Sequence, residues 1–168
     1  TGEIRIYNVE EIYESSFFNC ISIEKVEVGN KVKTIYPLAF YGCSNLKEVI
    51  IGESVTKLDG PVFSNCTGLK KLKMPISLDA EGYNGNYNYS SYGSRAFSGI
   101  KNISEITFSK GTGIGCNYSQ SNSTPWYYSK DSLTKVTLED GIITIGENMF
   151  YGCTALINLA IPSTVKTV

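Results

Sequence analysis

The sequence predicts a solenoid, in which short coils of chain stack on one another around a shared apolar core. Three observations predict it: a fixed repeat, an apolar content of 42%, and coils too short to bury their own apolar side chains. The repeat has a period of 23 residues. Its clearest columns are Phe17, Phe40 and Phe63, then Cys20, Cys43 and Cys66, then Val28, Ile51 and Met74.

About six coils account for the chain of 168 residues, which we expect to form one domain over 1–168. The apolar slots of the second coil are Val32, Ile35, Phe40, Cys43, Leu46, Val49 and Ile51. The first coil starts at Val9, and the third ends at Pro75. The sixth coil spans 142–162, with Leu159 and Ile161 in its strand, and Val165 begins a seventh that stops unfinished. We therefore expect the chain to be a fragment of a longer protein.

Each coil has its own expected local structure. Val49 and Ile51 alternate with other residues, which predicts a short strand with both apolar side chains pointing inward. Stacked coils would align these strands in parallel, about 4.8 Å apart. The segment 39–43 is too short for a helix and predicts a helical or 3₁₀ turn, and 32–35 predicts a second short strand.

The fourth and fifth coils are longer than the others. Phe97 lies 34 residues after Phe63, which leaves about 11 extra residues near 78–94. The fifth coil aligns with Tyr127 in the phenylalanine slot and Lys130 in the cysteine slot, with about 7 extra residues near 111–126. Insertions at one position of consecutive coils emerge side by side, often on the binding face.

The insertions are rich in Tyr, Gly, Asn and Ser, the residues that antibody contact loops favour. This composition indicates a partner-binding edge. The residues predicted to bind a partner there are Tyr83, Tyr87, Tyr118, Trp126 and Tyr128. The alternative is that some of these rings fill coil slots and the rest are ordinary solvated loop.

Five cysteines in a short chain first suggest a disulfide framework. Cys20, Cys43, Cys66 and Cys153 share one repeat slot, which elsewhere holds Ile100. A slot that accepts isoleucine is a packing position, so we predict buried free thiols, with a stacked cysteine pair as the alternative. Cys116 lies outside the repeat.

The outward side of the predicted strands carries a row of alternating charges. The row reads Lys25, Glu48, Lys71, Glu105, Lys135 and Asn158. Opposite charges on neighbouring strands stabilise the pairing by a few tenths to about 1 kcal/mol. We interpret this row as an ion-pair ladder that supports the stack rather than as a ligand-binding row.

The residue inventory argues against an enzyme. The chain contains no histidine, which removes the usual general base and the commonest metal ligand. Glu139 and Asp140 fit a turn, and the glycines over 111–115 lack the lysine of a phosphate-binding loop. We expect no catalytic residue, cofactor or metal. The net charge of −1 and the short apolar runs predict neither nucleic-acid binding nor membrane insertion.

The repeated pattern, most complete over 142–162, resembles the BspA-type leucine-rich repeats. The resemblance implies a leucine-rich repeat solenoid of right-handed coils with short parallel strands and little regular helix. It further implies an extracellular or cell-surface protein that mediates adhesion, with a host or bacterial surface protein as partner. Two alternatives stay open: a carbohydrate-binding surface on the insertions, and a structural spacer for another module.

Overall fold

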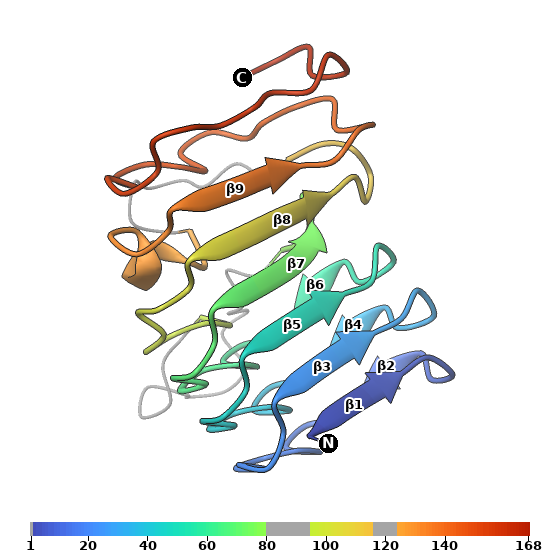
Figure 1. The fold of residues 1–168 in the computed structure, drawn as a ribbon. Coiled ribbons are helices and arrows are strands. Elements are labelled where there is room, and N and C mark those ends of the chain that lie inside the picture. Colours follow the sequence, from blue (N-terminus) through green and yellow to red (C-terminus); the bar gives the residue numbers. More distant parts are fainter. Residues whose placement is uncertain (1, 80–94, 116–123) are drawn as a thin grey trace.

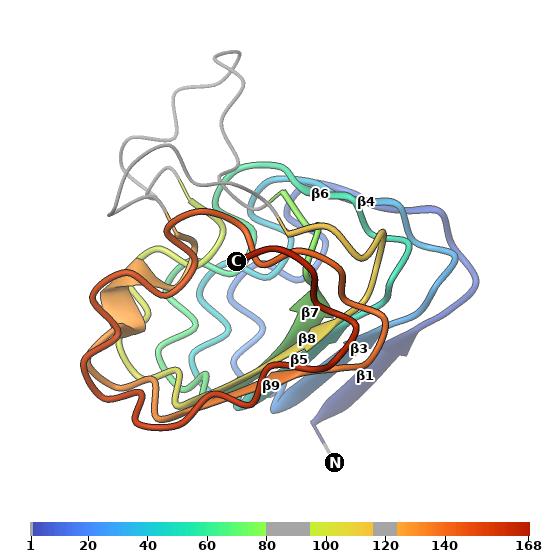
Figure 2. The same ribbon diagram turned by 90° about the horizontal axis from the view of Figure 1, so that it is seen from above.

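The computed structural model describes residues 2–79, 95–115 and 124–168. Over these residues the chain winds into a stack of coils with its two ends at opposite ends of the stack, which confirms the predicted solenoid (Figure 1). One parallel sheet has the order β1 (Glu3–Ile6), β3 (Lys25–Val28), β5 (Glu48–Ile51), β7 (Lys71–Pro75), β8 (Glu105–Ser109) and β9 (Lys135–Leu138). A smaller sheet has the order β2 (Glu11–Ile12), β4 (Thr34–Ile35) and β6 (Lys57–Leu58). Figure 2, which looks along the stack, shows the two sheets on different sides of the coils.

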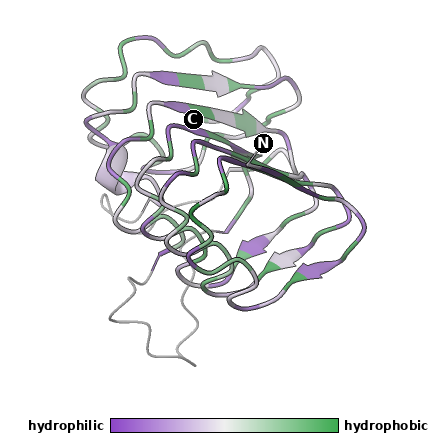
Figure 3. Ribbon diagram, turned by 60° about the horizontal axis from the view of Figure 1, so that its bottom comes forward, coloured by the Kyte–Doolittle hydropathy of each residue, from purple (hydrophilic) through white to green (hydrophobic). Residues whose placement is uncertain are grey.

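The 23-residue period sets how the strands pair. Val26 pairs with Val49, and Val49 pairs with Leu72, so each residue lies beside its own repeat equivalent. In β3 and β5 every second residue is buried and its neighbours are not, as alternation in a strand requires. Figure 3 shows this alternation of polar and apolar residues along the strands. The predicted parallel strands are confirmed.

A column of stacked phenylalanine rings fills the corner of each coil. Phe17, Phe40, Phe63 and Phe97 follow one another with ring centroids 4.9, 5.1 and 5.4 Å apart and planes within 7° of parallel. Three of these rings are completely buried, and Phe17 at the start of the stack is partly buried. Aromatic pairs contribute about 0.5–1.5 kcal/mol beyond the burial of their area.

The turn that follows each phenylalanine is ended by a left-handed residue. Two positions after the ring, five coils have a positive φ: Asn19 (55°), Gly42 (70°), Asn65 (61°), Gly99 (78°) and Gly152 (69°). Glycine and asparagine are the residues that adopt this conformation most readily. The segment 39–43 is accordingly a hydrogen-bonded turn, in which the Cys43 amide donates to the Phe40 carbonyl over 3.4 Å.

The fifth coil differs from the sequence-based alignment by one residue. Trp126 is 1% exposed and Ser129 is fully buried, so these residues occupy the phenylalanine and cysteine slots. The predicted occupants, Tyr127 and Lys130, are only partly buried, and their assignment was wrong. The reason lies at Tyr128, which replaces the left-handed Asn or Gly and has no positive φ. Without that reversal the turn continues as the 3₁₀ helix η1 (Tyr127–Ser129).

The two ends of the stack are less buried than the repeat predicts. Val9 is 45% exposed and Ile161 is 50% exposed, although both were assigned to apolar slots. The strand expected at Leu159 and Ile161 does not form, and the larger sheet ends at β9. An end coil packs against one neighbour only, so part of its apolar surface stays accessible.

The cysteines form the predicted packing column. Cys43 and Cys66 are buried, Cys20 and Cys153 are partly buried, and all four are free thiols. The Cys66 Sγ donates to the Phe40 carbonyl over 3.1 Å. The hydrogen bond with Cys43 and the burial of the site raise the pKa of the Cys66 thiol, which keeps it protonated. Cys116 lies outside the described residues.

Candidate functional site: the sheet face and the insertion edge

The outward side of the larger sheet, here called the sheet face, carries two rows of side chains. The first row consists of Glu3, Lys25, Glu48, Lys71, Glu105 and Lys135. The second row consists of Arg5, Glu27, Ile50, Lys73, Thr107 and Thr137. Direct strand pairing places each residue beside the next member of its row.

The first row is an ion-pair ladder, as predicted. Lys25 Nζ lies 3.1 Å from a Glu48 carboxylate oxygen. Glu105 forms ion pairs on both sides, at 3.6 Å with Lys71 and 3.8 Å with Lys135. The sixth residue predicted for this row, Asn158, lies outside any strand. The alternating charges of the first row thus stabilise the pairing of neighbouring strands on the solvent side of the sheet.

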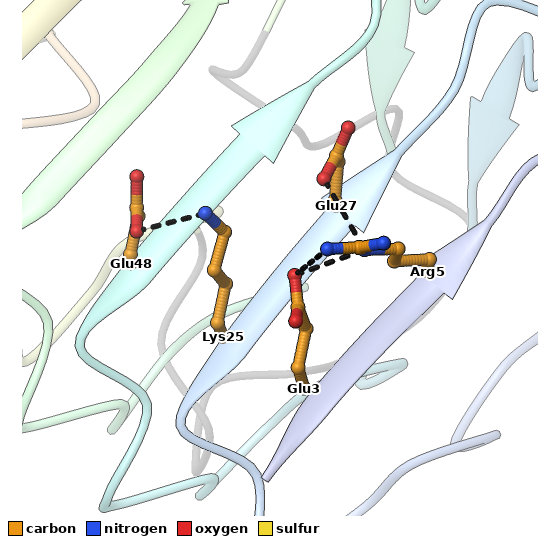
Figure 4. A network of polar contacts seen from close by, with 5 residues as sticks. All are labelled: Glu3, Arg5, Lys25, Glu27 and Glu48. Carbon is orange, nitrogen blue, oxygen red and sulfur yellow. Dashed lines mark hydrogen bonds and ion pairs between the residues drawn. The ribbon is translucent and has the colours of Figure 1, made fainter. Parts of the chain in front are cut away.

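A small polar network stands at the start of the sheet face (Figure 4). The Arg5 guanidinium lies 3.0 Å from Glu3 and 3.8 Å from Glu27. A hydrogen bond with Glu27, together with desolvation, raises the pKa of the Tyr7 hydroxyl. The period-2 pattern of Glu3–Ile6 could have revealed this strand. We did not predict it because Ile4 precedes Val26 by 22 residues rather than 23.

Two adjoining grooves hollow the sheet face, one of about 250 Å³ and one of about 350 Å³. They share Ile50 and Lys73, where the second row changes from an apolar to a charged residue. Lys73 leans toward the end of β9 and pairs with Glu139 at 2.6 Å. The larger groove continues to Tyr7. This face can therefore offer hydrogen bonds and charge to a partner, around a small apolar centre.

The insertion edge is the corner where the two longer coils carry their extra residues. Asp79 bridges to Lys57 and Ile114 bridges to Thr144, so the two insertions leave from equivalent places beside the smaller sheet. The described chain resumes two residues before Phe97 in one coil and two residues before Trp126 in the next.

The predicted binding residues of this edge have different environments. Tyr83, Tyr87 and Tyr118 lie outside the described residues. Tyr128 is 48% exposed and meets Tyr127 edge to face, with ring centroids 5.9 Å apart. Lys130 Nζ lies 6.0 Å from the centre of the Tyr127 ring, a cation–π contact. Tyr128 therefore offers its ring to solvent at this edge.

Trp126 does not offer its ring to a partner. Its side chain is buried, and its indole Nε1 donates to the Met149 carbonyl over 3.1 Å. The ring meets Phe108 edge to face at 5.2 Å. We correct the expectation for this residue: the indole closes the core of the fifth coil because both its apolar body and its N–H find partners there.

The glycine run over 111–115 serves packing between coils. The Gly115 amide donates to the Thr144 carbonyl over 3.0 Å, and the Gly113 amide donates to Lys110. A Cβ at position 115 would lie 2.7 Å from the Gly146 nitrogen of the next coil, so this close approach requires glycine at 115. Amides engaged in this way do not form a phosphate cradle.

The described part of the chain shows no constellation for metal or membrane chemistry. Over 2–79, 95–115 and 124–168, no three His, Cys, Asp or Glu side chains come close enough to hold a metal ion. Within the same residues, no helix has the length and apolar character needed to span a bilayer.

The comparisons with known proteins agree with the geometry. The model of the BspA type leucine-rich repeat region matches residues 2–87 and 120–168, in six copies. No curated protein matches the chain.

Three solved structures have a similar fold. They are leucine-rich repeat proteins from Eubacterium ventriosum (TM-score 0.64, 22% identity, 98% of this chain and 40% of that one), T. pallidum (0.55, 18%, 94% and 78%) and Bacteroides ovatus (0.52, 24%, 92% and 38%). The chain thus spans about 40% of the length of the Eubacterium ventriosum protein.

Proposed function

This chain belongs to the BspA-type leucine-rich repeat family, and from that premise we propose that it is a non-enzymatic adhesion domain displayed at the bacterial cell surface. Its partner in this proposal is a host or bacterial surface protein. The solenoid acts as the scaffold, and the insertion edge acts as the binding surface.

One observation carries the proposal: both insertions leave from, and return to, the same corner of consecutive coils. Two tyrosine-rich segments that start beside one another can contact a single partner together. The exposed Tyr128 ring stands in the same coil corner. The proposed contact residues are therefore Tyr83, Tyr87, Tyr118 and Tyr128.

The absence of histidine from the whole sequence supports a binding role over catalysis. Screening the chain against glycosidic and peptide substrates tests this part of the proposal. Turnover above the buffer rate that persists after repurification would overturn it.

A solid-phase assay tests the binding surface. The chain is applied to immobilised host extracellular-matrix proteins and, in parallel, to a glycan array. The variant Y83S/Y87S/Y118S/Y128S should lose protein binding because the rigid aromatic contacts are removed. Tyr13→Ser is the matched control, since Tyr13 is 67% exposed at the far end of the stack.

The outcomes separate the alternatives. Protein binding that the four-fold variant loses and the control keeps supports the adhesion edge. Binding to glycans alone, lost in the same variant, replaces the protein partner with a carbohydrate. Binding that survives in the four-fold variant contradicts the edge, and failure to bind either array favours the structural spacer.

A further inference from the structure

We propose that the sheet face binds the same face of a second copy of the chain, about a two-fold axis that runs along the strands midway between β5 and β7. The inference does not rest on the insertion edge or on the proposed adhesion function. It rests on the order of charges along the first row, on the second row, and on the twist of the sheet.

The first row is complementary to its own reverse. Rotation about this axis reverses the order of the strands, so each residue meets the residue at the mirrored position of the second copy. The opposed pairs are Glu3 with Lys135, Lys25 with Glu105, and Glu48 with Lys71. Symmetry forms each pair twice, so all six positions of the row face an opposite charge.

The second row adds no repulsion. Its opposed pairs are Arg5 with Thr137, Glu27 with Thr107, and Ile50 with Lys73. A lysine stem can cover an apolar side chain while its ammonium stays with its own partner. Lys73 already has such a partner in Glu139, at 2.6 Å. The two grooves adjoin at this central pair and leave room for it.

The charges also disfavour a two-fold axis that is shifted by half a strand spacing. An axis placed on β5 instead of beside it would oppose Lys25 to Lys71 and would bring the two Glu48 side chains together. Like charges held opposite one another disfavour such an arrangement strongly. The alternating row therefore rejects the alignment shifted by one coil, and among the complementary alignments this axis opposes all six positions of the row.

The right-handed twist that β-sheets generally have fits the same symmetry. A twisted sheet is saddle-shaped, and rotation by 180° about its central strand direction maps a saddle onto itself. The two faces therefore stay parallel along the whole row instead of diverging at the corners. Within each copy the ladder is kept, with Lys25 still beside Glu48 at 3.1 Å, so the contact extends an existing pattern.

The expected contact is weak. Six strands about 4.8 Å apart and two outward positions about 7 Å apart cover roughly 400 Å² per copy. This places the contact among small, transient and polar interfaces. Because it is held by exposed charges, we expect it to weaken as salt rises from about 0.1 M to about 1 M and the screening length falls from about 10 Å to about 3 Å.

Sedimentation velocity over a concentration series tests the inference on the 168-residue chain. We expect a reversible monomer–dimer equilibrium that shifts to monomer in high salt. Lys71→Glu places like charges at both central pairs and should raise the dissociation constant at least about tenfold. Lys33→Glu is the control: it breaks a ladder-like pair with Glu10 away from the sheet face and should leave the equilibrium unchanged.

A second variant separates the interface from the stability of the ladder. The inverted row E3K/K25E/E48K/K71E/E105K/K135E keeps every alternation within the copy. It should dimerise with itself but not with the wild type, because every first-row pair of a mixed dimer opposes like charges. Native mass spectrometry of an isotope-labelled mixture should show two homodimers without the mixed species.

Three results would overturn the inference. The first is a wild-type chain that stays monomeric up to ~1 mM. The second is a dimer that Lys71→Glu does not weaken more than Lys33→Glu does. The third is a statistical mixture of wild-type and inverted chains in the mixed experiment.

Discussion

The Phe40 ring lies flat against the Phe63 ring, with centroids 5.1 Å apart and planes within 6° of parallel. The two residues are 23 positions apart, and both are completely buried. Each of the first four coils thus supplies one ring to a continuous column. A coil that lost its ring would leave a hole between two neighbours, because the rings above and below cannot close the gap.

Truncating this column should be costly. Phe40→Ala should lower the free energy of unfolding by about 3–5 kcal/mol, through lost transfer energy and a cavity. Phe18→Ala truncates a ring that is 37% exposed and should lower the free energy of unfolding by clearly less. Urea unfolding followed by circular dichroism measures both. Equal losses for the two variants would contradict the ring column as a main source of stability.

The left-handed turn position gives a matched pair of glycine substitutions. Gly42 and Gly152 both have a φ near +70°, so alanine strains either backbone. At Gly42 a Cβ would also collide with the Asn19 side chain, whereas at Gly152 its nearest contact would be Lys130 Cδ at 3.5 Å. We expect Gly42→Ala to lower the melting temperature by more than Gly152→Ala. The reverse order would mean that contact with the preceding coil does not matter here.

The buried indole of Trp126 can be checked directly, because it is the only tryptophan. Its fluorescence should be blue-shifted in the native state and shielded from acrylamide, and it should become red-shifted and quenchable in urea. Trp126→Ala should cost about 3–5 kcal/mol, and Tyr127→Ala less. Native emission typical of a solvated indole would restore the alignment that puts Tyr127 in the core.

A double-mutant cycle measures the strength of one step of the ion-pair ladder. Lys25→Met and Glu48→Gln, alone and together, should show a coupling energy of about 0.2–1 kcal/mol, because both side chains are 32–36% exposed to solvent at the surface of the sheet. The coupling should decrease in 1 M salt as screening increases. A coupling that salt does not change would indicate packing rather than charge.

The carboxylate of Asp131 makes stability depend on pH. Hydrogen bonds from Lys130 at 2.6 Å and from Thr154 at 3.1 Å lower its pKa below the ordinary value of 3.8. A lowered native pKa stabilises the fold above the unfolded pKa, and this contribution is lost as the pH falls through the native pKa. Asp131→Asn should therefore melt earlier than the wild type at neutral pH.

As the pH falls through the native pKa of Asp131, the two melting temperatures should converge, since the wild-type carboxylate then becomes protonated. Thr154→Val is the control, because it removes one donor and keeps the charge. A difference between wild type and Asp131→Asn that stays constant over the pH range would show that the charge is not responsible.

The fifth coil marks the limit of sequence-based alignment. Trp126 and Tyr127 are neighbouring aromatic residues, and either one fits the apolar slot in the repeat pattern. The choice depends on the backbone at Tyr128, where no Asn or Gly reverses the chain. A pattern of residue types does not contain that backbone conformation, so the shift by one residue could not be predicted.

The insertion edge likewise combines a feature that the sequence predicts with one that it does not. Its expected position follows from the lengths of the fourth and fifth coils, and Asp79 and Ile114 beside the two insertions form β-bridges to Lys57 and Thr144. The exposure of individual rings did not follow, since Trp126 and Tyr128 belong to the same aromatic run and differ completely in burial.

By itself, the sequence determined the period, the coil count, the parallel pairing of strands and the alternating ladder, because stacking places each residue directly beside its repeat equivalent. The tertiary structure alone decided the occupant of the fifth aromatic slot and the loss of the last expected strand. Those features depend on local backbone turns and on how many neighbours a coil has, and neither is recorded in a repeating pattern of residue types.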